Sequence, residues 1–192
     1  MKILIASGNE GKIKEFKQLL GPLGFAVYGA KELGYTIDVE ETADTFLGNA
    51  LIKARYLYEK AQMPVLADDS GLVLEAFPDL LSVHSARFMQ GESYEKKHEA
   101  LLKRYETVAN RQAYFETALV LITDDVYTFT GQVDGHIALS AKGDQGFGYD
   151  PIFIPNGYDK TFAQIPEVKE KISHRAIATQ KLLNFLKEQQ NE

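Results

Sequence analysis

The sequence predicts an α/β protein in which helices pack around a mixed β-sheet. Three features predict this class: alternating strand and helix patterns over residues 2–76, two adjacent strand-like runs near the middle, and a helix pattern close to the C-terminal end. Parallel strands need a crossover connection, usually a helix, whereas two strands joined by a tight turn form an antiparallel hairpin. Both kinds of pairing are therefore expected in one sheet.

The first half of the chain alternates between strand and helix patterns. Residues 2–6 predict a short buried strand, which ends before Gly8 and Gly11. Apolar residues at helical spacing then predict a helix that ends at Gly21-Pro22. The further elements expected in this half are a strand over residues 25–28, an acidic loop over 38–44, a helix over 46–61 capped by Asp44 or Thr45, a strand over 65–67 and, beyond a turn, a continuation of the sheet over 72–76.

The second half is expected to add a hairpin and two helices. Strand-like runs on either side of Asp124-Asp125 predict the hairpin, and Ser173 is in a position to cap the last helix. The elements expected here are an irregular segment over residues 78–87, a charged amphipathic helix over 93–105, strands over 112–123 and 126–133, a glycine-rich loop over 143–151, a short strand over 152–154, and the final helix.

Composition narrows the class of protein. At 192 residues, with 45% hydrophobic and 25% charged residues, the chain is expected to form one soluble globular domain, 1–192. The absence of cysteine excludes disulfides and thiolate metal sites. The net charge of -6 disfavours a nucleic-acid surface, so a phosphate ligand would need a local cationic pocket or a divalent cation.

The chain shows no sign of a membrane segment. The apolar N-terminal run is too short for a signal peptide, and no apolar run approaches the roughly 20 residues of a membrane span. We therefore expect a cytoplasmic protein without a membrane partner.

Two adjacent carboxylates are the most informative local feature of the chain. Asp68 and Asp69 follow a predicted buried strand, where unpaired carboxylates are costly to bury. Neighbouring side chains on an extended segment point to opposite faces, so one of the two is expected in a site while the other faces elsewhere or caps the turn. Together with Glu40-Glu41, the pair could hold a hard cation such as Mg²⁺ through oxygen ligands.

Three further segments have the residue types of a site for phosphate or a nucleotide. Residues 7–12 place glycines, an asparagine and a lysine where a strand leads into a helix, and a helix N-terminus favours anions. In the loop over residues 146–151, glycines flank Phe147, which could stack on a base. Ser173-His174-Arg175 begins a helix one turn after Lys169 and suits a phosphate or a base carbonyl.

Taken in order along the chain, these segments resemble the Ham1 family, also called the inosine triphosphatase family. The resemblance covers nearly the whole chain and rests on an ordered set of motifs. They are Ser7, Asn9, Lys12 and Glu15; Glu40-Glu41-Thr42; Phe46 followed by Asn49 to Arg55; Ala67 to Gly71; Ser85-Ala86-Arg87; Arg111-x-Ala-x-Phe; Gly146 to Phe153; and Ser173-His174-Arg175.

The resemblance implies a fold and an activity. The expected fold is an elongated mixed sheet with flanking helices that form two lobes around a central cleft, in a homodimer. The expected reaction is Mg²⁺-dependent hydrolysis of ITP, dITP and XTP to the monophosphate and pyrophosphate, which removes deaminated purines from the nucleotide pool.

The resemblance also implies a role for each matching residue. Asp69 would be the general base and a metal ligand, with Glu41 and its neighbour Glu40 as further metal ligands. The triphosphate would contact Ser7, Gly8, Asn9, Glu10, Gly11, Lys12, Lys53 and Ser70. The nucleotide, including its base, would be held by Phe147, Gly148, Tyr149, Asp150, Lys169, His174 and Arg175.

Three other functions remain as alternatives. A Maf-like nucleotide pyrophosphatase would share the reaction but prefer another base, and a nucleotide-binding sensor would bind without turnover. A phosphatase with an aspartyl nucleophile would release orthophosphate, although its usual Asp-x-Asp spacing is absent because the pair here is Asp68-Asp69.

Overall fold

The computed structural model describes residues 1–85 and 87–189, which divide into two compact units. The first unit comprises Met1–Asp69, Thr117–Thr130 and the segment that starts at Ala178. The second comprises Ser70–Glu116 and Gly131–Ile177. Each unit has its own hydrophobic core, so each is described by itself.

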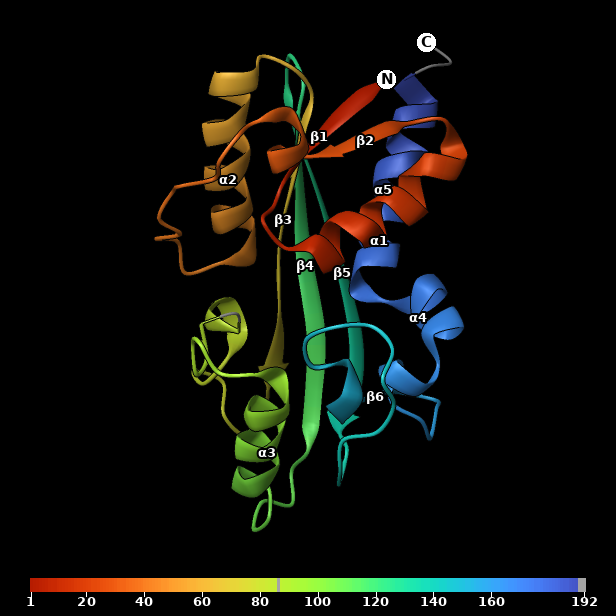
Figure 1. The fold of residues 1–192 in the computed structure, drawn as a ribbon. Coiled ribbons are helices and arrows are strands. Elements are labelled where there is room, and N and C mark those ends of the chain that lie inside the picture. Colours follow the sequence, from red (N-terminus) through yellow and green to blue (C-terminus); the bar gives the residue numbers. More distant parts are fainter. Residues whose placement is uncertain (86, 190–192) are drawn as a thin grey trace. The chain divides into compact units, whose positions relative to one another are not determined.

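The β-strands form one sheet with the order β2-β1-β3-β4-β5-β6 (Figure 1). The strands are β1 (Lys2–Ala6), β2 (Ala26–Gly29), β3 (Val65–Leu74), β4 (Gln112–Ile122), β5 (Val126–Ile137) and β6 (Phe153–Pro155). β1 pairs in parallel with both β2 and β3, whereas β5 and β6 are antiparallel. The sheet is therefore mixed, as the sequence predicted.

In the first unit, helices cover both faces of the strands. α1 (Glu10–Leu20) and the part of α5 (His174–Gln189) that starts at Ala178 pack on Ile3, Ile5 and Leu66, whereas α2 (Phe46–Ala61) packs on the alternate residues Leu4, Ala6 and Val65. Figure 1 shows α2 on one side of these strands and α1 with α5 on the other. The alternation follows from the strand geometry, because successive side chains point to opposite faces.

The second unit is built around the C-terminal part of β3, from Ser70 on, and the N-terminal part of β4, up to Glu116. Its core combines residues of these strands with α3 (Tyr94–Arg104) and the segments on either side of β6, and the members with the lowest exposure are Leu72, Leu74, Leu81, Leu101, Ile152, Phe153 and Phe162. α4 (Pro166–Ile172) precedes α5. Short 3-10 helices span Gly21–Leu23 and Ala30–Leu33 in the first unit. In the second unit they span Ser82–His84, Asp150–Ile152 and Phe162–Gln164.

The structure corrects several of the expected element boundaries. No turn separates residues 65–67 from residues 72–76, because β3 runs without interruption through Asp68 to Gly71. Both aspartates are paired with lysines there, so the strand can continue through them while they stay buried. β5 extends four residues beyond Val133. The short helix α4 was not expected, since it has a single turn of apolar periodicity.

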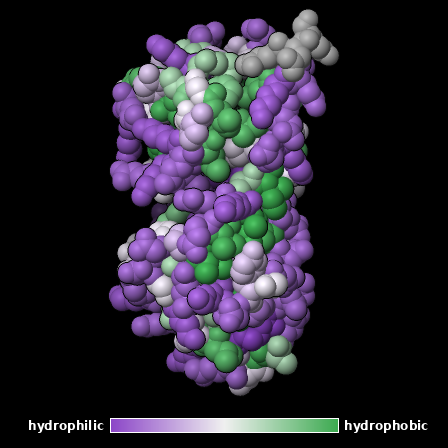
Figure 2. All heavy atoms as spheres, turned by 90° about the vertical axis from the view of Figure 1, so that its right-hand side faces the viewer, coloured by the Kyte–Doolittle hydropathy of each residue, from purple (hydrophilic) through white to green (hydrophobic). Residues whose placement is uncertain are grey.

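The ends of two other helices agree with the expected capping. Thr45 rather than Asp44 caps α2, with its hydroxyl accepting from the Gly48 backbone N–H at 3.0 Å. The Ser173 hydroxyl accepts from the Ala176 backbone N–H at 3.1 Å at the start of α5. Within the described ranges, no helix combines the length and the apolar character needed to cross a membrane. Hydrophilic side chains dominate the face drawn in Figure 2, with hydrophobic patches between them.

The packing of α2 predicts a large loss of stability when its core face is truncated. Leu57 is fully buried on this face, so Leu57→Ala should lower the free energy of unfolding by about 2–5 kcal/mol. Glu59→Ala changes an exposed residue on the same helix and should have little effect. Denaturant unfolding followed by circular dichroism measures both, and equal losses in the two variants would contradict the packing described here.

Candidate active site

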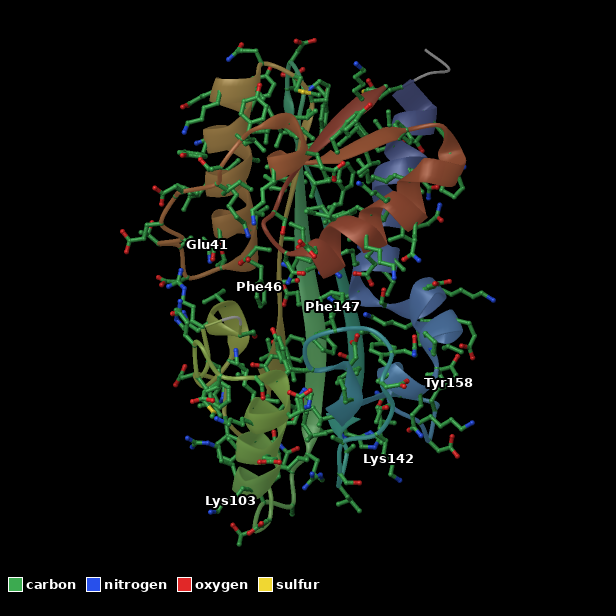
Figure 3. The ribbon with its side chains drawn as sticks, viewed as in Figure 1. Glu41, Phe46, Lys103, Lys142, Phe147 and Tyr158 are labelled. Atoms are coloured by element: carbon green, nitrogen blue, oxygen red, sulfur yellow. The ribbon has the colours of Figure 1, made fainter. Side chains whose placement is uncertain are left out.

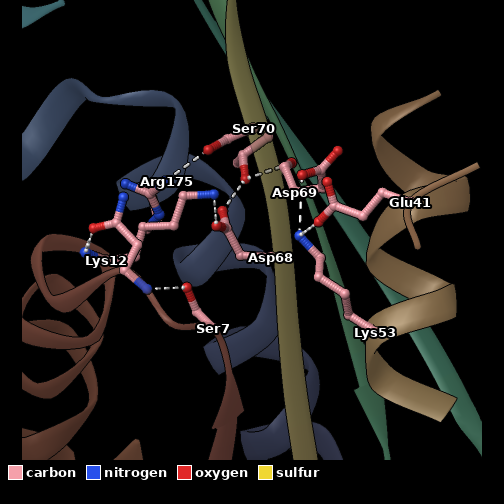
Figure 4. A network of polar contacts seen from close by, with 10 residues as sticks. Ser7, Lys12, Glu41, Lys53, Asp68, Asp69, Ser70 and Arg175 are labelled. Carbon is pink, nitrogen blue, oxygen red and sulfur yellow. Dashed lines mark hydrogen bonds and ion pairs between the residues drawn. The ribbon is translucent and has the colours of Figure 1, made fainter. Parts of the chain in front are cut away.

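Asp68 and Asp69 lie in the middle of β3 and point to opposite faces of the strand (Figure 4). Asp68 has the same parity as Leu66, which packs on α1, and Asp69 has the same parity as Ala67, which packs on α2. Their exposed fractions are only 0% and 6%. The prediction that the two carboxylates face different surroundings is confirmed, and each has a cation of its own.

The carboxylate of Asp68 is held by a lysine and a threonine. Lys12 Nζ of α1 lies 2.5 Å from Asp68 Oδ1, and the Thr117 hydroxyl of β4 donates to Asp68 Oδ2 at 2.6 Å. With Asp68 fully buried, the ion pair keeps the Lys12 ammonium at the N-terminal end of α1. Thr117 was not expected here, because no sequence motif marks it and only the sheet order brings it next to Asp68.

The carboxylate of Asp69 shares a lysine with Glu41. Lys53 Nζ of α2 lies 3.0 Å from Asp69 Oδ1 and 2.8 Å from Glu41 Oε1, so the ammonium is held between the two carboxylates (Figure 4). Glu41 lies in the loop that precedes α2 (Figure 3). Its neighbour Glu40 is exposed, whereas Glu41 is half-buried.

Burial raises the pKa of Asp69, although the nearby Lys53 and Lys12 ammonium groups act in the opposite direction. The carboxyl group is therefore more basic than an exposed aspartate. For Lys53, burial disfavours the ammonium form, but the Asp69 and Glu41 carboxylates outweigh it and raise the pKa of Lys53 above its usual value. Lys53 therefore stays charged at neutral pH.

The loop between β1 and α1 places backbone N–H groups next to Lys12. The Ser7 hydroxyl accepts from the Asn9 backbone N–H at 3.1 Å, and Asn9 caps α1 by accepting from the Lys12 backbone N–H at 3.2 Å. Ser7 is buried, whereas Gly8, Asn9 and Glu10 are exposed. The capping leaves an open helix N-terminus beside a lysine, an arrangement that suits an anion.

Asp69 and Glu41 fit the donor set of Mg²⁺. The second carboxylate oxygen of Asp69, Oδ2, is buried and accepts no hydrogen bond within the described part of the chain. Among the described residues there is no group of three or more His, Cys, Asp and Glu side chains that could hold a metal. A pair of carboxylates still suffices for Mg²⁺, which typically takes one or two carboxylates and fills its other positions with water and substrate phosphates.

In the second unit, a cluster of two cations and a carboxylate surrounds Phe147. Lys169 Nζ lies 2.7 Å from Asp150 Oδ2 and 4.6 Å from the centre of the Phe147 ring, and Arg175 Cζ lies 5.9 Å from the same ring centre. Arg175 Nη2 also donates to the Ser70 hydroxyl at 2.9 Å (Figure 4). The half-buried ring of Phe147 thus presents its π-surface among positive charges.

The other members of this loop have structural contacts. Tyr149 is buried in the core, where its hydroxyl donates to the Ser85 carbonyl at 2.9 Å and burial raises its pKa. The Gly148 carbonyl lies 2.8 Å from His98 Nε2. Outside the loop, His174 at the start of α5 stacks on Phe115 with ring centres 5.0 Å apart and ring planes 11° apart. The loop therefore offers Phe147 and Asp150 beside Lys169 and Arg175, while Tyr149 supports it from the core.

These features define an α/β protein whose buried carboxylates, lysines and open helix N-terminus suit a charged phosphate ligand. The chain belongs to the Ham1 family, and the model of that family matches residues 3–185.

The chain is similar over nearly its full length to several known proteins. It is 44% identical to the dITP/XTP pyrophosphatase of Aquifex aeolicus (strain VF5), with 97% of each chain covered. Its structure matches the Ham1 protein of Staphylococcus aureus with a TM-score of 0.86 at 38% identity, covering 98% of this chain and 100% of that chain. A HAM1 protein from Coxiella burnetii matches with a TM-score of 0.87 at 33% identity, with 98% and 99% covered.

The close approach of Gly146 to Asp150 predicts that a side chain at position 146 destabilises the Phe147 loop. Gly146 has a φ of +80°, and a β-carbon there would collide with the Asp150 carboxylate that pairs with Lys169. Gly146→Ala should therefore lower the free energy of unfolding by about 1–3 kcal/mol more than the backbone strain alone. Gly157→Ala is the matched control, because its φ is +85° and its β-carbon would meet open space. Thermal unfolding of the two variants measures the difference, and identical losses would argue against the collision.

Proposed function

We propose that this chain is a nucleoside-triphosphate pyrophosphatase that hydrolyses dITP, ITP and XTP to the monophosphate and pyrophosphate, and so removes deaminated purines from the nucleotide pool. The observation that carries the proposal is the geometry at Asp69. This carboxylate is buried, burial raises its pKa, one oxygen contacts Lys53, and the other accepts no hydrogen bond from the described residues. The relatives named dITP/XTP pyrophosphatase, similar over 97% of this chain, support the same activity.

In the proposed mechanism, Asp69 acts as the general base. Its raised pKa makes it a better proton acceptor at neutral pH than an ordinary aspartate. Asp69 orients a water molecule and takes its proton while the water oxygen bonds to the α-phosphorus. The bond from the α-phosphorus to the oxygen that bridges it to the β-phosphorus breaks, and pyrophosphate leaves with the electron pair. No covalent intermediate forms on the protein.

The triphosphate is proposed to bind at the cationic groups of the first unit. Lys12 and Lys53 would neutralise phosphate oxygens, and the backbone N–H groups of residues 7–12 would donate to them. Lys53 is already held by two carboxylates, so it is fixed in place before a ligand arrives. Ser70 would add a hydroxyl donor. This arrangement would stabilise the charge that develops on the departing pyrophosphate.

Glu41 and Asp69 are the proposed ligands of a Mg²⁺ ion, with Glu40 as their neighbour. When bound, Mg²⁺ would withdraw charge from the phosphate oxygens as a Lewis acid. Lys53 would remain beside both carboxylates and balance their charge.

The base is proposed to bind at the cluster around Phe147. The ring would stack on the purine, and Lys169, His174 and Arg175 would supply hydrogen-bond donors. Hypoxanthine and xanthine carry an oxo acceptor at position 6, whereas adenine carries an amino donor there. A site lined with donors would leave the adenine amino group unpaired, and such a mismatch can discriminate strongly. Gly148, Tyr149 and Asp150 would hold the ring of Phe147 in place.

The proposal also covers the oligomeric state and the cellular location of the enzyme. We propose that it functions as a homodimer in the cytoplasm, on the strength of the family resemblance. Size-exclusion chromatography with light scattering would determine the oligomeric state directly.

A substrate panel tests the proposed activity first. The protein is incubated with ITP, dITP, XTP, GTP and ATP, with and without Mg²⁺, and pyrophosphate and orthophosphate are assayed separately. We expect Mg²⁺-dependent pyrophosphate release from ITP, dITP and XTP, little product from GTP and ATP, and loss of activity with EDTA that added Mg²⁺ restores. Release of orthophosphate would exclude attack on the α-phosphorus, and ITP binding without any turnover would favour a sensor.

Substitution of the proposed base tests the mechanism. Asp69→Asn keeps the size of the side chain but removes its basicity, so kcat should fall by about 100-fold or more while KM changes by less than about threefold. Asp124→Asn, in the exposed turn between β4 and β5, is the matched control and should retain full activity. Near-normal turnover of Asp69→Asn would remove Asp69 from the role of base.

A further inference from the structure

The helix α3 touches the Phe147 loop at Gly148. His98 Nε2 lies 2.8 Å from the Gly148 carbonyl oxygen, and His98 is 6% exposed. A carbonyl oxygen only accepts, so Nε2 carries the proton and donates this hydrogen bond. The contact links residues 50 positions apart in the sequence, both in the second unit.

The backbone that His98 holds has an unusual conformation. Gly148 has a φ of +64°, in the left-handed region that favours glycine. A second residue of α3, Tyr94, lies against the same turn: its ring meets the Tyr149 ring edge-on at 5.4 Å, and a β-carbon on Gly148 would lie 3.8 Å from it. The carbonyl of the peptide between Gly148 and Tyr149 is therefore held by a hydrogen bond from α3, and the Tyr94 ring packs beside the same turn.

The residues after Gly148 are held by other parts of the second unit. The Tyr149 hydroxyl donates to the Ser85 carbonyl, and the Asp150 carboxylate accepts from both Lys169 and the Phe147 backbone N–H, the latter at 2.9 Å. These contacts anchor Tyr149 and Asp150, and the Asp150 carboxylate in turn holds the Phe147 backbone N–H. The hydrogen bond from His98 fixes the carbonyl of Gly148, the residue that directly follows Phe147 in the chain.

We propose that His98 is a positioning residue for nucleotide recognition. Its hydrogen bond to Gly148 holds the Phe147 ring against Lys169 and Arg175, in the orientation that receives the purine. The proposal rests on the proposed function to the extent that the ligand of Phe147 is a purine nucleotide. It assigns to α3 a role in binding that no motif in the sequence indicates.

A pair of variants of equal length separates the hydrogen bond from simple packing. His98→Gln keeps a side-chain N–H donor, whereas His98→Met fills a similar volume and cannot donate. Glu99→Met changes an exposed neighbour on the same helix and is the control. Steady-state kinetics with XTP give KM and kcat for each protein, and thermal unfolding shows that each is folded.

We expect a selective change in KM. His98→Met should raise KM for XTP by about tenfold with kcat changed by less than about threefold, because a lost positioning bond weakens binding more than chemistry. His98→Gln and Glu99→Met should stay close to the unmodified protein. Equal KM values for His98→Gln and His98→Met would overturn the proposal, as would a parallel fall in kcat that glutamine does not rescue.

Hydrogen–deuterium exchange distinguishes a failure of this proposal from a failure of the proposed function. Absence of turnover with every nucleotide of the panel would refute the function, but the exchange of residues 146–150 can still be compared between variants. Faster exchange in His98→Met, with protection retained in His98→Gln, supports the positioning role. Equal exchange in the two variants overturns it.

Discussion

Two consecutive buried aspartates impose the main constraint on the first unit. A carboxylate removed from water is tolerated only when it is paired and hydrogen-bonded, and consecutive residues of a strand face opposite sides. The fold therefore has to supply a cation on each face of β3. α1 supplies Lys12 to Asp68 at 2.5 Å, and α2 supplies Lys53 to Asp69 at 3.0 Å. Removal of either lysine would leave an uncompensated buried charge, which is strongly destabilising.

The same constraint prepares the chemistry that we propose. The two aspartates do not have equal surroundings: Asp68 is satisfied by Lys12 and Thr117, whereas Asp69 keeps one oxygen without a hydrogen-bond donor from the described residues. Asp68 is thus suited to fixing Lys12 in place. Asp69 is suited to accepting a proton or a cation, and its raised pKa reflects the burial that makes this possible.

In the second unit, the main requirement is to hold the Phe147 loop, which has little regular structure, in one conformation. Left-handed glycines at positions 146 and 148 allow the loop to turn tightly, and contacts from α3, Ser85 and Lys169 fix Gly148, Tyr149 and Asp150 in turn. Ordering a flexible loop costs conformational entropy. Each contact that already holds the loop therefore lowers the entropic cost of binding a ligand there. The position of Phe147 among Lys169 and Arg175 depends on these anchors together.

The sequence by itself determined the alternating elements of the first half and the hairpin, because helical spacing and glycine breaks are local signals. The glycine turn also marked Lys12 as a candidate, whereas Lys53 and the choice of Asp69 over Asp68 came from the resemblance of their motifs to the family. It misread residues 68–71 as a turn, since Asp, Ser and Gly usually break strands when no partner is present. Only the tertiary structure showed that lysines from α1 and α2 allow β3 to continue there. Thr117 and His98 likewise acquire their roles through contacts 49 and 50 residues away along the chain, a separation over which no periodicity or motif carries information.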